Sequence, residues 1–160
     1  MTPERKGTAL RIAQTGAEIT IGRDPGRVYE FVTTPANWVG THPVTAAVEG
    51  ATRAPAAAGA RWVELIRPPG DAAGFRTEWL ATLAAPGHTW VIETDRLRTT
   101  GVRCQIVYTF ADHPQGTYFR RDMSVLVDDT ADVDESLFAN LSDGSAHESY
   151  LRAVKAALER

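Results

Sequence analysis

Few side chains of this sequence combine a charge with a predicted place in the interior, and Arg121 is the clearest. It shares an alternating strand face with Phe119 and Met123, which is the apolar face of that strand. An arginine on such a face must pair with a carboxylate or contact a ligand anion, because burying an unpaired charge is costly. The pattern therefore nominates Arg121 as a catalytic or ligand-binding residue. A register shifted by one residue would instead place it in solvent.

Two histidines and a tyrosine are further candidates for proton transfer. His42 follows a short helical segment in a loop, and an imidazole there could exchange protons near neutral pH. His147 and Tyr150 are three residues apart in a helical segment, so they share one flank of that helix. We name Arg121, His42, His147 and Tyr150 as candidate catalytic residues. Surface hydrogen bonding for His42, and helix packing for the other two, are the alternatives.

Two glutamates, Glu64 and Glu93, would serve as general bases only if burial raised their pKa values. We expect both to face solvent. Cys104 is the single cysteine and lies among apolar residues of a predicted strand, which favours a small buried hydrophobe.

Motifs for cofactors are missing from the sequence. The four histidines are never spaced i, i+4 and no His-Glu-x-x-His sequence occurs, so we predict no metal. The chain also lacks a P-loop, a Gly-x-Gly-x-x-Gly sequence after a strand and a Gly-x-Ser-x-Gly elbow. We therefore expect no cofactor.

The periodicity of the chain predicts the elements that position these residues. A chain of 160 residues can bury a sizeable core, and we assign residues 16–160 to a single domain. Residues 1–15 are expected to be a flexible leader or an extra edge strand. Strand and helix patterns then follow one another over residues 17–21, 24–32, 34–39, 44–49, 61–66, 74–84, 90–94, 102–110, 117–127 and 145–159.

This order is strand, two short helices, six strands and a closing helix, which indicates an α+β fold with antiparallel strands. About seven strands should form a curved sheet around the long C-terminal helix and leave an internal cavity. In the strand over residues 74–84, alternation places Trp79 and Leu83 on the same face. The apolar faces supply candidate ligand-binding residues, although core packing is the alternative for each. These candidates are Trp38, Trp79, Trp90, Ile92, Tyr108, Phe110, Phe119, Met123, Arg121 and Tyr150.

Four local sequences carry a resemblance to a known superfamily. They are Ile19-Thr20-Ile21 with residues 24–32 and Thr34-Pro35-Ala36-Asn37-Trp38, Gly59-Ala60-Arg61-Trp62, Tyr108-Thr109-Phe110 with Gly116-Thr117, and the closing segment 150–159. In this order they resemble the START/Bet v 1-like (SRPBCC) superfamily, including its polyketide cyclase/dehydrase and lipid-transport branch. The resemblance covers roughly residues 16–159. It implies a helix-grip fold and places the loop of His42 near the mouth of a cavity.

Two functions from different classes are compatible with these features. A binding module would hold a lipid, quinone or polyketide-like molecule, and the clear aromatic faces favour it. An enzyme would cyclise or dehydrate a polyketide-like substrate, using Arg121 and His42, or His147 with Tyr150. A different α+β cone, the NTF2-like fold, ranks lower because its long helices precede the sheet.

Composition limits the partners. Lys and Arg number 17 against 20 Asp and Glu, and the net charge of -3 argues against nucleic-acid binding. No apolar run is long enough to span a membrane, and the start lacks a signal-peptide pattern, so we expect a cytoplasmic protein without integral membrane association. A small hydrophobic ligand is the expected partner. A homodimer through the edge strand is a further option.

Overall fold

The computed structural model describes residues 10–133 and 135–160. Its strands are β1 (Arg11–Ile21), β2 (Thr45–Glu49), β3 (Arg61–Ile66), β4 (Phe75–Ala85), β5 (Thr89–Thr94), β6 (Val102–His113) and β7 (Gly116–Val127). Its helices are α1 (Pro25–Val32), the 3-10 helix η1 (Pro35–Trp38), α2 (Glu135–Leu141) and α3 (Ser145–Leu158).

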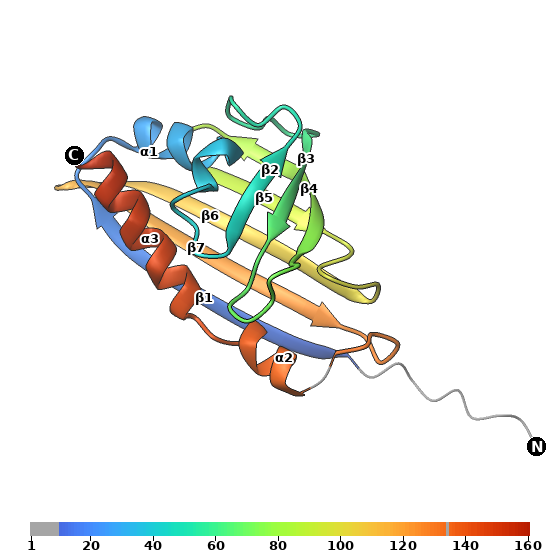
Figure 1. Cartoon of the computed structure of the whole chain (residues 1–160). Coiled ribbons are helices and arrows are strands. Elements are labelled where there is room, and N and C mark those ends of the chain that lie inside the picture. The colour runs from blue at the N-terminus through green and yellow to red at the C-terminus, as the bar shows by residue number, and fades with distance from the viewer. Residues whose placement is uncertain (1–9, 134) are drawn as a thin grey trace, which may run out of the picture.

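The seven strands form one antiparallel sheet in the order β1-β7-β6-β5-β4-β3-β2. Figure 1 shows that the sheet curls, so that β2, β3 and β4 rise opposite β1. Helix α3 crosses the open side of this curl and packs on β1. The predicted α+β helix-grip fold, with about seven strands and a closing helix, is confirmed.

Two short helices close one end of the curled sheet. Asp24 caps α1 by accepting a hydrogen bond from the Arg27 amide at 3.3 Å, and Pro25 occupies the first turn, where its missing N–H costs nothing. Trp38, at the end of η1, donates its indole N–H to the Val32 carbonyl at 3.0 Å. This bond ties η1 to α1, so that both helices cap the same end of the core.

The first strand begins earlier than the sequence predicts. Residues 11–16 belong to β1, where Arg11 pairs with Val127 and Ile21 with Thr117. The polar side chains of this segment hide the alternation, but the long neighbouring strand β7 supplies backbone partners along its whole length. The part of the predicted leader that comprises residues 1–9 lies outside the described residues.

A β-bulge changes the face of one predicted inward residue. The register of β4 against β5 shifts between Ala81 and Leu83, and Leu83 is 48% exposed. A bulge inserts one extra residue, and this reverses the alternation beyond it. The prediction that Leu83 shares the inner face of Trp79 is therefore wrong.

Candidate functional site

A cavity of about 500 Å³ lies between the sheet and α3. Its interior wall combines side chains from β3, β4, β6, β7 and α3, and its rim comes from the loops before β2, between β3 and β4, between β5 and β6, and from the α2–α3 junction. Among its lining residues are His42, Glu64, Ile66, Phe75, Trp79, Leu97, Arg98, Ile106, Arg121, Met123 and His147. Its size is within the range of small-molecule sites.

Arg121 projects into this space from the middle of β7 and is 6% exposed. Its Nε–H donates to the Tyr108 hydroxyl at 3.3 Å, and one Nη1–H donates to His147 Nδ1 at 3.0 Å. The guanidinium also lies over the rings of Tyr108 and Tyr150, at 5.5 and 5.4 Å from their centroids. A guanidinium has five N–H donors, so two bonds leave three without a partner among the described residues.

The Arg121 contact determines the tautomer of His147. A guanidinium can only donate, so Nδ1 of His147 must accept and its ring proton lies on Nε2. That nitrogen lies 2.8 Å from the hydroxyl oxygen of Thr15 and donates to it. Burial, with the positive charge of Arg121 as the second cause, lowers the pKa of His147 to about 3. His147 is therefore a neutral residue that holds Arg121 in place.

Glu64 is buried at 4% exposure, which makes the expectation of a solvent-facing Glu64 wrong. It shares the inner face of β3 with Trp62 and Ile66, and this alternation was the signal available in the sequence. Thr45 donates to one carboxylate oxygen at 2.5 Å and the Trp79 indole donates to the other at 2.8 Å. Burial raises the pKa of Glu64, against the opposing effects of these two hydrogen bonds and of Arg121.

Arg121 and Glu64 line the same cavity without forming an ion pair. No carboxylate oxygen of the described residues lies within 4.0 Å of the Arg121 guanidinium nitrogens. The positive charge of Arg121 nevertheless acts on Glu64, because it opposes the rise in the pKa of that carboxyl group. The cavity therefore presents a cationic donor group and a carboxylate that remain apart.

His42 and Tyr150 lie next to this pair. His42 lines the cavity, and its ring packs on Tyr150 with centroids 5.1 Å apart. Burial, then Arg121 and His147, lowers the pKa of His42 well below its ordinary value. The Tyr150 hydroxyl is buried and has no hydrogen-bond partner among the described residues, and burial raises its pKa well above the ordinary value.

The structure divides the predicted ligand-binding set into two groups. Trp79, Arg121 and Met123 line the cavity, and Tyr108 and Tyr150 contact Arg121 directly. The remaining members pack in the closed part of the core and are absent from the cavity lining; they are Trp38, Trp90, Ile92, Phe110 and Phe119.

Aromatic stacking explains this division. Trp38, Trp62 and Trp90 contact one another with centroids 5.6 to 6.2 Å apart, and Phe110 stacks on Phe119 at 5.1 Å. Large aromatic rings that pack against one another fill the closed end of the curled sheet. Alternation reports only which face a residue occupies, so it could not separate this packed end from the hollow one.

Other predicted candidates lie away from the cavity or play no chemical part in it. Glu93 faces outward and accepts a hydrogen bond from Gln105 at 2.7 Å. Cys104 is buried, and burial raises its pKa to about 12, so it is a protonated thiol as expected for a core position.

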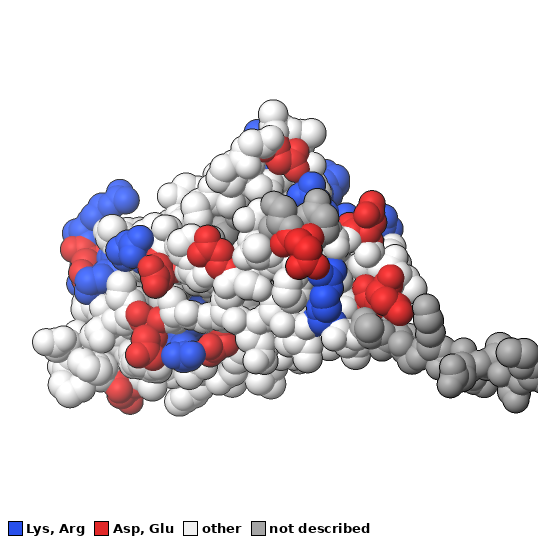
Figure 2. Space-filling model, turned by 90° about the horizontal axis from the view of Figure 1, so that it is seen from below, with Lys and Arg blue, Asp and Glu red and all other residues white. Residues whose placement is uncertain are grey.

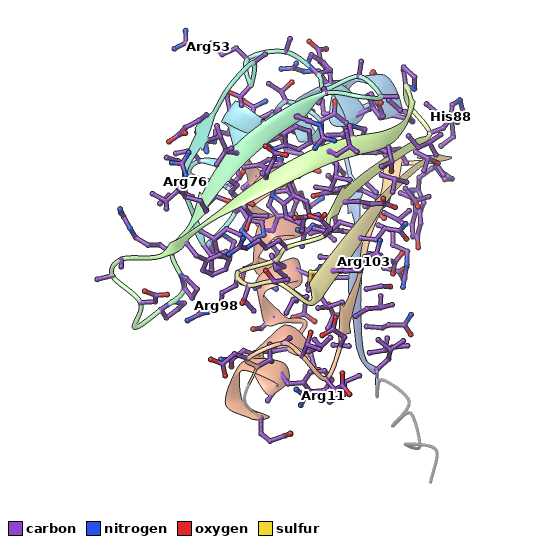
Figure 3. All side chains as sticks on the ribbon, turned by 90° about the vertical axis from the view of Figure 1, so that its right-hand side faces the viewer. Arg11, Arg53, Arg76, His88, Arg98 and Arg103 are labelled. Atoms are coloured by element: carbon purple, nitrogen blue, oxygen red, sulfur yellow. The ribbon has the colours of Figure 1, made fainter. Side chains whose placement is uncertain are left out.

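Acidic and basic side chains alternate over the face of the molecule seen in Figure 2, without a large patch of one sign. Arg76 and Arg103 extend from the outer face of the sheet, whereas Arg98 lies beside the loop between β3 and β4 at the cavity rim (Figure 3). Arg98 contacts that loop through Asp71 at 3.8 Å. Among the described residues, no helix is both long and apolar enough to cross a membrane.

Comparison with known proteins places the chain in a family. No family model matches it. The penitrem biosynthesis cluster 1 protein I of Penicillium ochrochloron is 32% identical over 149 residues, which cover 89% of this chain and 94% of that protein.

Solved structures share the fold. The di-domain ARO/CYC protein BexL from the BE-7585A biosynthetic pathway has a TM-score of 0.72 at 19% identity, over 93% of this chain and 50% of BexL. Ara h 8.0201 has a TM-score of 0.66 at 8% identity, over 93% of this chain and 99% of that protein. The chain has the fold of BexL and Ara h 8.0201, which is the helix-grip fold that the resemblance to the START/Bet v 1-like superfamily implies. Because of its identity to the penitrem cluster protein over most of both chains, it belongs to the same family as that protein.

Proposed function

We propose that this protein binds a small, largely apolar molecule that carries a carbonyl or another electron-rich oxygen, and that it does so in a biosynthetic pathway. The observation that carries this proposal is Arg121. It is a buried cation at the cavity wall with three N–H donors that no described residue accepts from. Burying such a group without partners is costly, and a ligand oxygen would satisfy it.

The rest of the cavity supports an apolar ligand. Ile66, Phe75, Trp79, Ile106 and Met123 contribute hydrocarbon and aromatic surface around the few polar groups. Ligand sites commonly combine such walls with a small number of placed donors that orient the ligand. The lining thus favours a ring-bearing or lipid-like skeleton with its oxygen at Arg121.

The relatives support a biosynthetic role. The relative that is 32% identical is named for penitrem biosynthesis, and BexL is an ARO/CYC protein of another biosynthetic pathway. This chain matches the first of these over most of its length. A ligand that is an intermediate of natural-product synthesis accounts for these relationships.

Two probes with the same bicyclic carbon skeleton test the proposal. We expect 2-tetralone, which has a ketone oxygen, to bind at least about tenfold more tightly than tetralin, which has none. Two-dimensional NMR titration of the labelled protein measures both affinities, and the perturbed amides should lie around the cavity.

Substitution of Arg121 links this preference to its cause. Arg121→Met should make the two affinities nearly equal, whereas Arg103→Met, at an exposed arginine on the outer face, should leave the preference unchanged. Equal binding of both probes to the unmodified protein would contradict the proposal. Absence of binding by either, or perturbations confined to the outer face, would contradict it as well.

An enzyme of the cyclase or dehydratase type is the second candidate. One observation favours it: Glu64, a buried carboxylate, lines the same cavity as the unneutralised Arg121. A base and a cation facing one ligand are the groups that formation of an enolate requires.

A further inference from the structure

We propose that Glu64 transfers a proton to and from the carbon next to the ligand carbonyl, while Arg121 holds the carbonyl oxygen. This activity rests on the proposed function, because it needs a ligand whose oxygen is bound by Arg121. It assigns proton transfer to a residue other than the histidines and tyrosine nominated from the sequence.

The position of Glu64 suits this role. Its carboxylate lines the cavity from β3, and contacts with two neighbouring strands hold it, one from Thr45 of β2 and one from Trp79 of β4. Each bond occupies one lone pair of one oxygen, and a carboxylate has about four such sites. Lone pairs therefore remain on an oxygen that is held in one orientation.

The separation of Glu64 from Arg121 leaves room for ligand atoms. The two groups line one cavity, yet no oxygen of Glu64 comes within 4.0 Å of the guanidinium. In the proposed complex, the carbonyl oxygen lies at Arg121 and the adjacent C–H faces Glu64. Burial raises the pKa of Glu64, which makes it a stronger base than an exposed glutamate.

The two histidines are less suited to the task. Both ring nitrogens of His147 already have partners, Arg121 on one side and Thr15 on the other. His42 has the backbone N–H of Val44 near its Nδ1, and its lowered pKa makes it a weak base. Among the described groups of the cavity wall, Glu64 combines a free lone pair with appreciable basicity.

The proposed step is a reversible proton transfer. A Glu64 oxygen takes the proton from the α-carbon, the C–H electron pair forms a carbon–carbon double bond, and the carbonyl electron pair moves to oxygen. Arg121 N–H groups stabilise the resulting enolate, as donors aimed at developing charge do. In D2O the proton taken up by Glu64 is replaced by a deuteron from solvent, and delivery of this deuteron to the α-carbon restores the ketone, so no oxidant, reductant or leaving group is involved.

Hydrogen–deuterium exchange of 2-tetralone in D2O measures this step. Proton NMR follows the loss of the α-proton signals with the protein present and in buffer alone. We expect the protein to accelerate exchange above the buffer rate, and Glu64→Gln to reduce this excess by about 10²-fold or more. The amide introduced by that substitution can still bond Thr45 and Trp79, so the site keeps its shape. Glu93→Gln, at a carboxylate on the outer face, should leave the rate unchanged.

The affinity of 2-tetralone, measured in the same samples, separates this inference from the proposed function. Binding without acceleration, or equal acceleration by the unmodified protein and by Glu64→Gln, would overturn the role of Glu64 and leave the binding function standing. No binding at all would remove both. Retained binding with lost exchange in Glu64→Gln would support the inference, because a purely structural role would not separate the two.

Discussion

At the residue scale, His147 shows how the charge of Arg121 controls the protonation of a neighbouring side chain. It lies between the Arg121 guanidinium and the Thr15 hydroxyl, at 2% exposure. Protonation would put a second positive charge beside Arg121 in a place with little water. The folded protein therefore keeps the imidazole neutral, whereas the unfolded chain lets it titrate normally.

This difference predicts a pH dependence of stability. The folded pKa of about 3 lies below the ordinary value of 6.5, so the unfolded state binds more protons between these values. The stabilising contribution is complete above pH 6.5 and is lost as the pH falls through this window. From pH 7 to pH 5, we expect His147 to account for a loss of about 2 kcal/mol in the free energy of unfolding.

Denaturant unfolding of the unmodified protein and of His147→Gln at both pH values measures this contribution as a difference. The comparison cancels the opposite trend of Glu64, whose raised pKa makes the fold less stable as pH rises. His88→Gln, in an exposed turn, should keep the pH slope of the unmodified protein. Parallel slopes for all three proteins would show that His147 titrates in the fold as it does in the unfolded chain.

At the element scale, α3 is the closing wall of the cavity, and it is anchored at its C-terminal end. Lys155 donates to the Thr20 carbonyl at 2.8 Å, and Glu159 accepts from the Gly22 amide at 2.7 Å. Leu151 and Val154 face the core from the middle of the helix, at 1% and 0% exposure. These contacts place His147 at the cavity wall, one turn from Leu151.

Truncation of Leu151 tests the packing of this helix. Leu151→Ala should lower the free energy of unfolding by about 2–5 kcal/mol, because it removes a fully buried side chain and leaves a cavity. Leu83→Ala makes the same chemical change at a strand position that is 48% exposed, and should cost less than about 0.5 kcal/mol. Urea titration measures both. A cost below about 0.5 kcal/mol for Leu151→Ala would mean that this face of α3 does not hold the core together.

At the scale of the whole molecule, the curled sheet separates a packed end from a hollow end. Stacked tryptophans and α1 with η1 fill the first, while loops and the start of α3 surround the second. The fold therefore supports its cavity with a core that does not depend on ligand. β1 and β2 are the two edge strands of the sheet, and the homodimer through the N-terminal edge stays a prediction.

A ligand that binds only the folded state should stabilise the whole molecule. At a concentration of about 100 times its Kd, 2-tetralone should add about 2.7 kcal/mol to the free energy of unfolding. For a chain of this size that corresponds to a rise in Tm of about 5–10 °C. Calorimetry with and without the probe measures it. Tetralin at the same concentration is the control, and an equal rise with both would contradict oxygen recognition by Arg121.

Periodicity along single strands made much of the architecture predictable. Alternation placed Arg121, Tyr108 and Met123 on inner faces, because a half-buried strand repeats every two residues. The same rule fails at Leu83, where a bulge adds a residue. For Glu64 the rule predicts burial, because Trp62 and Ile66 share its face, whereas its residue type predicts exposure. A carboxylate is so seldom buried that its residue type outweighed its position.

The sequence by itself predicted most of the order of the elements and most inner faces of the strands, and it favoured an inward Arg121, because these features depend on neighbours two to four residues away. Only the tertiary structure decided which partners meet. Thr15 and His147 are 132 residues apart, and Glu64 is held by residues 19 and 15 positions away on two other strands. Such contacts depend on how the sheet curls and on where α3 crosses it. The spacing of residues along one strand predicts neither of these features.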